Sequence, residues 1–180
     1  APTSGMVLTT DVEVLRALTK IAKDKAPGPS GMTSDVLAQV VEYEHTHGGS
    51  EVLEKLTAVV RSILNDEMTL DEAMAVRQIR LVALAKRKPD GTYKGVRPVA
   101  MSETILKIAA MVALARCEHL GSKWACQYGL RKGGVEPAIF RVTDGFRSGK
   151  RVRTFDASNA YNTVWRSAFF KELAMLDSEE

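Results

Sequence analysis

The chain has 180 residues, of which 45% are hydrophobic and 26% are charged, and its formal net charge is +3. This length fits one domain or two small lobes, and this composition is typical of a globular protein with a hydrophobic core. No run of about 18 apolar residues occurs, so we expect no membrane-spanning helix. The first residues lack a secretory signal and the two cysteines form no metal-binding pattern, so we expect an intracellular protein of the nucleus or cytoplasm.

The first part of the chain is predicted to be helical. Thr10 precedes apolar residues spaced three and four apart, which predicts a capped helix that ends near Asp24. Thr33 or Ser34 begins a second helix, and a polar loop follows over residues 43–50. The side chains expected to face inward on these two helices are Val12, Leu15, Leu18, Ile21, Ala22, Val36, Leu37, Val40 and Val41.

Two further helices are predicted before residue 79. Ser50 begins a helix with a wide apolar face, which indicates core packing rather than a ligand site. Thr69 and Glu72 have the spacing of a capping box, so a short helix follows them. The inward side chains of the longer helix are expected to be Val52, Leu53, Leu56, Val59, Val60, Ile63 and Leu64.

A β-hairpin with a basic tip is predicted next. Residues 79–86 are predicted to form one strand, Pro89-Asp90-Gly91 is a turn signal, and residues 93–99 form the returning strand. Arg suits bidentate contact with phosphate better than Lys does, so such a hairpin is suited to binding a phosphate chain. The alternative is a surface hairpin with solubilising charges. The cations at its tip are Arg87, Lys88, Lys94 and Arg97.

Two helices and a glycine-rich block follow the hairpin. Ser102 is predicted to cap a long helix that is apolar on most sides and ends at Gly121, with Lys107 extending its charged end to water. Residues 127–134 place an aromatic beside Arg and glycines, which suits base stacking, or else form a connector with a buried Tyr. Residues 135–146 are predicted to be helical, with Ala138, Ile139, Val142 and Phe146 inward.

The last segment contains a candidate catalytic acid. Residues 151–156 are predicted to form a strand that ends in Asp156, followed by a turn and a helix with apolar spacing from Val164. Loops at strand ends often carry chemistry, and Mg²⁺ prefers carboxylate and phosphate oxygens, so an acid beside Arg151 and Arg153 suits a metal held against a phosphate. The alternative is that Asp156 caps the turn.

Residues 156–161, Asp-Ala-Ser-Asn-Ala-Tyr, resemble motif A of reverse transcriptases, and the continuation Asn-Thr-Val resembles the non-LTR retrotransposon form. The resemblance implies that Asp156 is catalytic and that its carboxylate and the Ala157 carbonyl bind Mg²⁺ or Mn²⁺. It also implies that Tyr161 lies under the sugar of the incoming nucleotide and excludes a 2′-hydroxyl.

Three other blocks resemble the same family in the same order. Residues 25–31, Lys-Ala-Pro-Gly-Pro-Ser-Gly, are similar to its opening block, which usually has Asp at the position of Ser30. Residues 81–101 resemble its fingers hairpin, which implies that Arg97, together with Lys86 or Lys88, binds the triphosphate of the nucleotide. The third block implies contact with template and primer through Gln127, Tyr128, Gly129 and Arg131.

The resemblance implies an α+β fold: a helix-rich polymerase fingers subdomain with a β-hairpin, and the first strand and helix of the palm. We expect residues 1–76 to form the helical part of the fingers, 77–149 the hairpin and its helices, and 150–180 the start of the palm. The family takes further carboxylates from a Tyr-x-Asp-Asp turn, whereas Asp177 is the one Asp after Asp156 here. We therefore expect a fragment that is inactive alone and that adds dNTPs to a DNA primer on an RNA template in a longer enzyme.

Two alternatives remain beside this interpretation. A reverse-transcriptase-like lobe would also serve as a non-catalytic nucleic-acid-binding or scaffold module. An RNA-dependent RNA polymerase is disfavoured, because those enzymes usually carry an acid at the position of Tyr161. An unfinished sheet edge also favours pairing with a second copy, so a homodimer is a further hypothesis.

Overall fold

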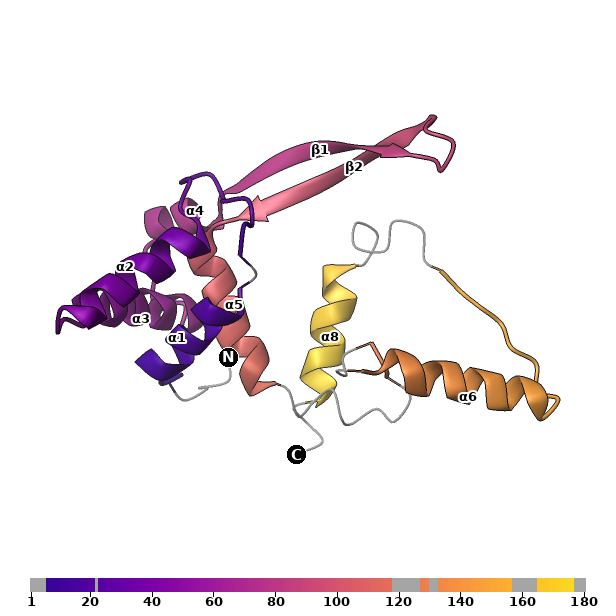
Figure 1. The fold of residues 1–180 in the computed structure, drawn as a ribbon. Helices are drawn as coiled ribbons and strands as arrows, with labels where there is room; N and C mark the ends of the chain where they lie inside the picture. The colour runs from indigo at the N-terminus through magenta and orange to yellow at the C-terminus, as the bar shows by residue number, and fades with distance from the viewer. Residues whose placement is uncertain (1–5, 22, 118–126, 130–132, 157–164, 177–180) are drawn as a thin grey trace. The chain divides into compact units, whose positions relative to one another are not determined.

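A computed structural model of the chain describes residues 6–21, 23–117, 127–129, 133–156 and 165–176 (Figure 1). The chain divides into two compact units, Ala1–Trp124 and Ala125–Glu180. Helices and one antiparallel hairpin make up the described part, which confirms the predicted α+β class. The first unit contains α1 (Asp11–Lys20), α2 (Ser34–Thr46), α3 (Glu51–Leu64), α4 (Leu70–Arg77), β1 (Ile79–Arg87), β2 (Tyr93–Ser102) and α5 (Thr104–Arg116), and the second contains α6 (Val135–Arg147) and α8 (Arg166–Leu176).

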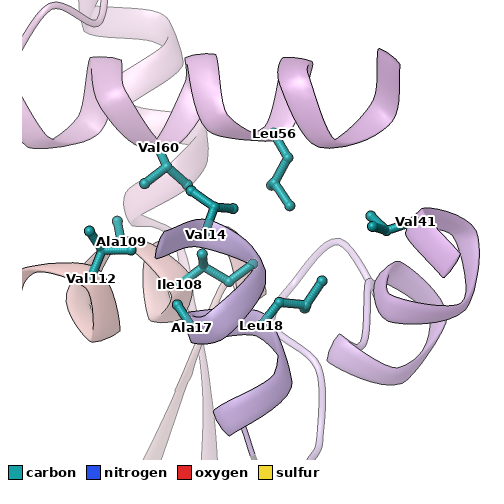
Figure 2. Close-up of a cluster of buried hydrophobic side chains, with 9 residues drawn as sticks. All are labelled: Val14, Ala17, Leu18, Val41, Leu56, Val60, Ile108, Ala109 and Val112. Carbon is teal, nitrogen blue, oxygen red and sulfur yellow. The ribbon is translucent and has the colours of Figure 1, made fainter. Parts of the chain in front are cut away.

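The core of the first unit lies among α1, α2, α3 and α5. Figure 2 shows the apolar side chains of these helices pointing toward one another. Val14, Val60 and Ile108 are completely buried, and burying a side chain of this size contributes about 1.5–3 kcal/mol. The α5 helix packs against α1, α3 and α4, and α2 packs against α1 and α3. The buried apolar residues are Val14, Ala17, Leu18, Val41, Leu56, Val60, Ile108, Ala109 and Val112.

The buried face of α1 matches the predicted one in part, since Leu18 is buried and Ile21 packs against the core as predicted. Val14, Ala17 and Leu18 are buried, whereas Val12 and Leu15 are exposed. The buried positions follow the i, i+3, i+4 spacing of a single helical stripe, and Val12 and Leu15 lie beside that stripe. The α2 and α3 helices show the same effect at the edges of their faces, where Val36, Val40 and Val59 are exposed.

Several predicted boundaries were also wrong. The α1 helix ends at Lys20 instead of near Asp24, and α2 continues through Thr46 into the predicted polar loop. Ser102 does not cap α5, because it is paired with Ile79 as the last residue of β2. Glu103 is the N-cap residue of α5, which ends at Arg116, and the predicted end at Gly121 lies outside the described residues.

Glu13 connects the start of α1 to the end of α5. Thr10 caps α1 as predicted, and it forms a capping box with Glu13, in which the Thr10 amide and hydroxyl donate to Oε2 of Glu13 at 2.9 and 3.0 Å. The Arg116 guanidinium donates to both carboxylate oxygens of Glu13, from Nε at 2.9 Å and from its terminal nitrogen at 3.0 Å. Hydrogen bonds from Thr10 and the Arg116 cation hold the pKa of Glu13 below its ordinary value.

The second unit has the predicted helices but not the predicted burial. The α6 helix matches the predicted segment, yet Ile139, Val142 and Phe146 are exposed, because no other described element of this unit covers that face. Residues 150–156 lie outside any helix or strand, so the predicted strand before Asp156 is absent there. A strand requires a hydrogen-bonded partner, and the described residues of this unit supply none.

Across the described ranges, no helix combines the length and the apolar character that crossing a membrane requires.

We predict that Glu13→Gln lowers the melting temperature near neutral pH by about 2–4 °C, which corresponds to roughly 1 kcal/mol for a chain of this size. Because the folded-state pKa is lowered, the stabilisation is complete above about pH 5 and is lost as the pH falls below about 4.3. Both side chains of the Glu13–Arg116 pair are about one-third exposed. Screening by water therefore limits the contribution of this ion pair to the free energy of unfolding.

Thermal unfolding followed by circular dichroism at pH 7 and pH 3 measures this difference. Glu42→Gln changes an exposed acid and is the matched control. A deficit of Glu13→Gln that is as large at pH 3 as at pH 7 would contradict the assignment.

Candidate nucleotide-binding surface on the hairpin

The register of the hairpin determines which cations share a face. The β1 and β2 strands pair antiparallel, with Leu84 opposite Arg97 and Lys86 opposite Gly95. Residues directly opposite each other point to the same face, and the side chains of each strand alternate between faces. Lys86 and Arg97 therefore lie on one face as diagonal neighbours, a relation that places Cα atoms about 7–8 Å apart.

Arg80 lies on the same face at the base of the hairpin, opposite Met101. Arg80 was not among the predicted site residues, although its even spacing from Lys86 along one strand would have indicated a shared face. We call Arg80, Lys86 and Arg97 the basic face. The opposite face is exposed and carries no cation between Ile79 and Ala85 or between Val96 and Ala100.

Gly95 leaves open space beside Lys86 and Arg97. It has a φ of +146°, and an added Cβ there would meet nothing within 4 Å. The register shifts between Lys86 and Arg87, next to this glycine. A glycine in a strand often permits close approach of a ligand to the backbone, so Gly95 suits an anion placed between the two cations.

The tip of the hairpin is a closed turn. The Asp90 carboxylate accepts hydrogen bonds from the Thr92 amide at 2.9 Å and hydroxyl at 2.6 Å, and these bonds lower the pKa of Asp90. Arg87 donates to the Gly91 carbonyl at 3.1 Å, so it serves the turn rather than the basic face. Lys88 lies in the turn itself, and its amide donates to the Thr92 carbonyl at 2.9 Å.

The cations of the predicted triphosphate site are available for a ligand. Lys86, Lys88 and Arg97 are all exposed. Within the described part of the chain, the salt bridges involve Lys55, Arg77 and Arg116, and none involves the hairpin. The arrangement brings Lys86 and Arg97 together on the basic face and places Lys88 at the tip.

The remaining predicted site residues belong to the second unit. Asp156 is exposed, and Ala157, Tyr161 and Arg131 lie outside the described residues. Gln127 accepts a hydrogen bond from the Gly129 amide at 2.9 Å, which closes a small local turn. Tyr128 is half-buried, and its hydroxyl lies 3.2 Å from the Arg141 guanidinium, so this turn is tied to α6.

The described residues do not complete a metal site around Asp156. No group of three His, Cys, Asp or Glu side chains lies close enough together in the described ranges to hold an ion. Mg²⁺ prefers near-octahedral oxygen coordination, and one carboxylate supplies a small part of it. A metal at Asp156 would need ligands beyond this one carboxylate.

Comparison with protein-family models, curated proteins and solved structures found no match to this chain. The relationship to reverse transcriptases consequently stays a prediction, based on the four sequence blocks.

We predict that Lys86 and Arg97 act together on one anion. Lys86→Ala and Arg97→Ala should each weaken binding of inorganic tripolyphosphate about fivefold, or about 1 kcal/mol, which is suited to exposed ion pairs. Because the two cations share a face, the double variant should lose less than the product of the single losses. For Lys88→Ala with Arg97→Ala, the loss of affinity in the double variant should equal the product of the two single losses.

Isothermal titration calorimetry at low salt measures these affinities, since salt screens exposed charges. Arg16→Ala, which removes an exposed cation from α1, is the matched control. The double-variant loss is compared with the product of the two single losses for each pair. An equal departure from that product for the Lys86–Arg97 and Lys88–Arg97 pairs would show that the shared face has no effect on binding.

Proposed function

We propose that this chain is part of an RNA-directed DNA polymerase of the reverse transcriptase family, comprising fingers and the start of the palm. In this role it contributes to a site for a dNTP, an RNA template and a DNA primer. The observation that supports the proposal most directly is the position of Lys86 and Arg97 on one exposed face, beside Gly95.

The basic face suits the triphosphate of a nucleotide. Phosphoryl transfer is catalysed mainly by positioning the phosphates and by stabilising their charge. Arg97 can donate two parallel hydrogen bonds to phosphate oxygens, and Lys86 supplies a compact point charge next to it. The hairpin holds the two cations at a constant spacing, because their backbones belong to one hydrogen-bonded ladder.

In the proposed enzyme, Asp156 is the catalytic carboxylate of motif A. Two-metal phosphoryl transfer requires several carboxylates around a pair of ions about 4 Å apart. Asp156 alone cannot provide that arrangement. The isolated chain is therefore proposed to bind nucleotides without catalysing primer extension.

The triphosphate assignment predicts a dependence on phosphate number. A dNTP should bind the isolated chain roughly tenfold more tightly than the matching dNMP. The dNMP lacks the two outer phosphates, so it cannot accept the charge-assisted hydrogen bonds that they would receive. Arg97→Ala should remove most of this difference, and Arg97→Lys should retain part of it, since Lys keeps the charge without the bidentate geometry. Competition against a fluorescent dATP analogue measures the series, with Arg16→Ala as the control.

The same titration separates the proposal from a non-catalytic scaffold. A scaffold that binds RNA through its charges should show strong salt dependence but no preference for dNTP over dNMP. Equal affinities for the two nucleotides, together with salt-dependent RNA binding, would favour the scaffold.

Primer extension tests the catalytic part of the proposal. We expect the isolated chain to give no extension product on an RNA template with Mg²⁺ or Mn²⁺, because the described residues give Asp156 no partner carboxylates for a metal pair. Gel analysis of a labelled primer measures this. Extension that Asp156→Ala abolishes and Glu42→Gln leaves intact would overturn the expectation of inactivity.

A further inference from the structure

The turn formed by residues 25–32 is attached to the joint between the hairpin and α5. Glu103 is the one residue between the last residue of β2, Ser102, and the first residue of α5, Thr104. It is 8% exposed, so a carboxylate is buried at this joint. A buried carboxylate requires hydrogen-bond donors, and the turn provides them.

Ser30 supplies two donors to Glu103. The Ser30 amide donates to Oε1 of Glu103 at 2.8 Å, and the Ser30 hydroxyl donates to Oε2 at 2.6 Å. The Glu103 side chain makes no capping bond to α5, although Glu103 is the N-cap residue. Its carboxylate is thus directed to the turn, more than 70 residues earlier in the chain.

Two further contacts attach the same turn to α5. The Thr104 hydroxyl donates to the Met32 carbonyl at 2.6 Å. The half-buried Lys107 places its ammonium 3.4 Å from the Ala26 carbonyl, so its charged end contacts the turn as well as water. The turn is therefore held at both of its ends.

Gly28 shows how closely the turn approaches the joint. A Cβ at this position would lie 2.8 Å from the Glu103 amide nitrogen and Cα and from the Ser102 carbonyl oxygen. These are backbone atoms of the joint itself, which cannot move as a side chain would. The turn and the joint are in direct backbone contact.

The hairpin depends on this joint for its direction. Its two strands pack mainly against each other, and it extends away from the helices of the first unit (Figure 1). The β2 strand is about 30 Å long at about 3.3 Å per residue, so a rotation of about 10° at the base moves the tip by about 5 Å. Such a shift is large, because a misplacement of about 1 Å at a reacting group can lower a rate 100-fold.

We propose that Ser30 and Glu103 are positioning residues that set the direction of the hairpin and thereby place Arg97 and Lys86. The placement of these cations for a triphosphate rests on the proposed function, whereas the control of hairpin direction does not. The pair acts from the base of the hairpin, and neither side chain belongs to the basic face.

The chemistry of the pair allows a reciprocal exchange. Ser30→Asp places two carboxylates against each other and removes the hydroxyl donor, so the turn should separate from the joint. Adding Glu103→Gln restores a donor, because the new amide can donate to the introduced carboxylate and its oxygen can still accept from the backbone amide. The double variant has the same net charge as the original chain, which removes long-range charge as an explanation.

The direction of the hairpin can be measured between two spin labels. Lys88→Cys at the tip and Lys20→Cys at the end of α1 provide exposed attachment sites, with Cys117 and Cys126 replaced by Ser. Pulsed electron paramagnetic resonance then gives the distribution of label distances. We expect Ser30→Asp to broaden or shift this distribution, Ser30→Asp with Glu103→Gln to restore it, and Ser167→Asp, an exposed control on α8, to leave it unchanged.

Binding of inorganic tripolyphosphate by the same Ser30 and Glu103 variants, with Lys88 and Lys20 retained, provides the second measurement. Ser30→Asp should leave it unchanged, because a rotation of the hairpin moves Lys86 and Arg97 together and keeps their spacing. Binding weakened as much by Ser30→Asp as by Arg97→Ala would overturn the positioning role, because it would show that the substitution disturbs the basic face itself. Loss of any Arg97 effect would instead count against the proposed function, and the label distances would still test the hairpin direction.

Two outcomes of the distance measurement would overturn the proposal. One is an unchanged distribution of label distances for folded Ser30→Asp, and the other is a double variant whose distribution is as broad or as shifted as that of Ser30→Asp. If Ser30→Asp does not fold, Ser30→Ala, Glu103→Ala and their combination replace it. Since the two side chains act through one contact, the double alanine variant should broaden the distribution no more than Glu103→Ala does. Additive broadening would show that they act separately.

Discussion

A two-stranded hairpin is only marginally stable by itself in water, and this constraint determines how the first unit is built. The β1 and β2 strands have no third strand among the described residues, so their stability and direction depend on the segments at their base. The α5 helix provides that base, because Ile108 and Val112 bury it in the helical core while Glu103 begins it at the end of β2. The core therefore supports the hairpin through the backbone instead of through a packed sheet face.

The contacts around α5 divide into two sets with different roles. At the end of α5, Arg116 donates hydrogen bonds to Glu13 of α1, so this contact connects two helices of the core. At the start of α5, Glu103 and Thr104 fasten the turn of residues 25–32 beside the hairpin. The first set stabilises the helical core. The second set connects that core to the base of the hairpin, which carries the basic face. In the proposed polymerase, this division separates the residues that maintain the fold from those that aim the nucleotide-binding cations.

Local patterns predicted the elements of this chain well, and burial less well. The cap at Thr10, the capping box at Thr69 and the hairpin turn at Asp90 were correctly identified, because each depends on residues within a few positions of one another. The inward face of α6 was predicted wrongly, because apolar spacing shows which side of a helix is suited to burial but not whether another element covers it. The strand before Asp156 was predicted wrongly for the same reason, since a strand also needs a partner.

The sequence by itself determined the helices, the hairpin and the candidate chemistry of Arg97 and Asp156, because side-chain type and short-range spacing are properties of the chain. Only the tertiary structure decided that Lys86, rather than Lys88, shares a face with Arg97, since strand register follows from pairing. It likewise decided that Ser30 binds Glu103, a contact between residues 73 positions apart. Contacts at that separation form when the helical core brings the two segments together, and no local pattern contains that information.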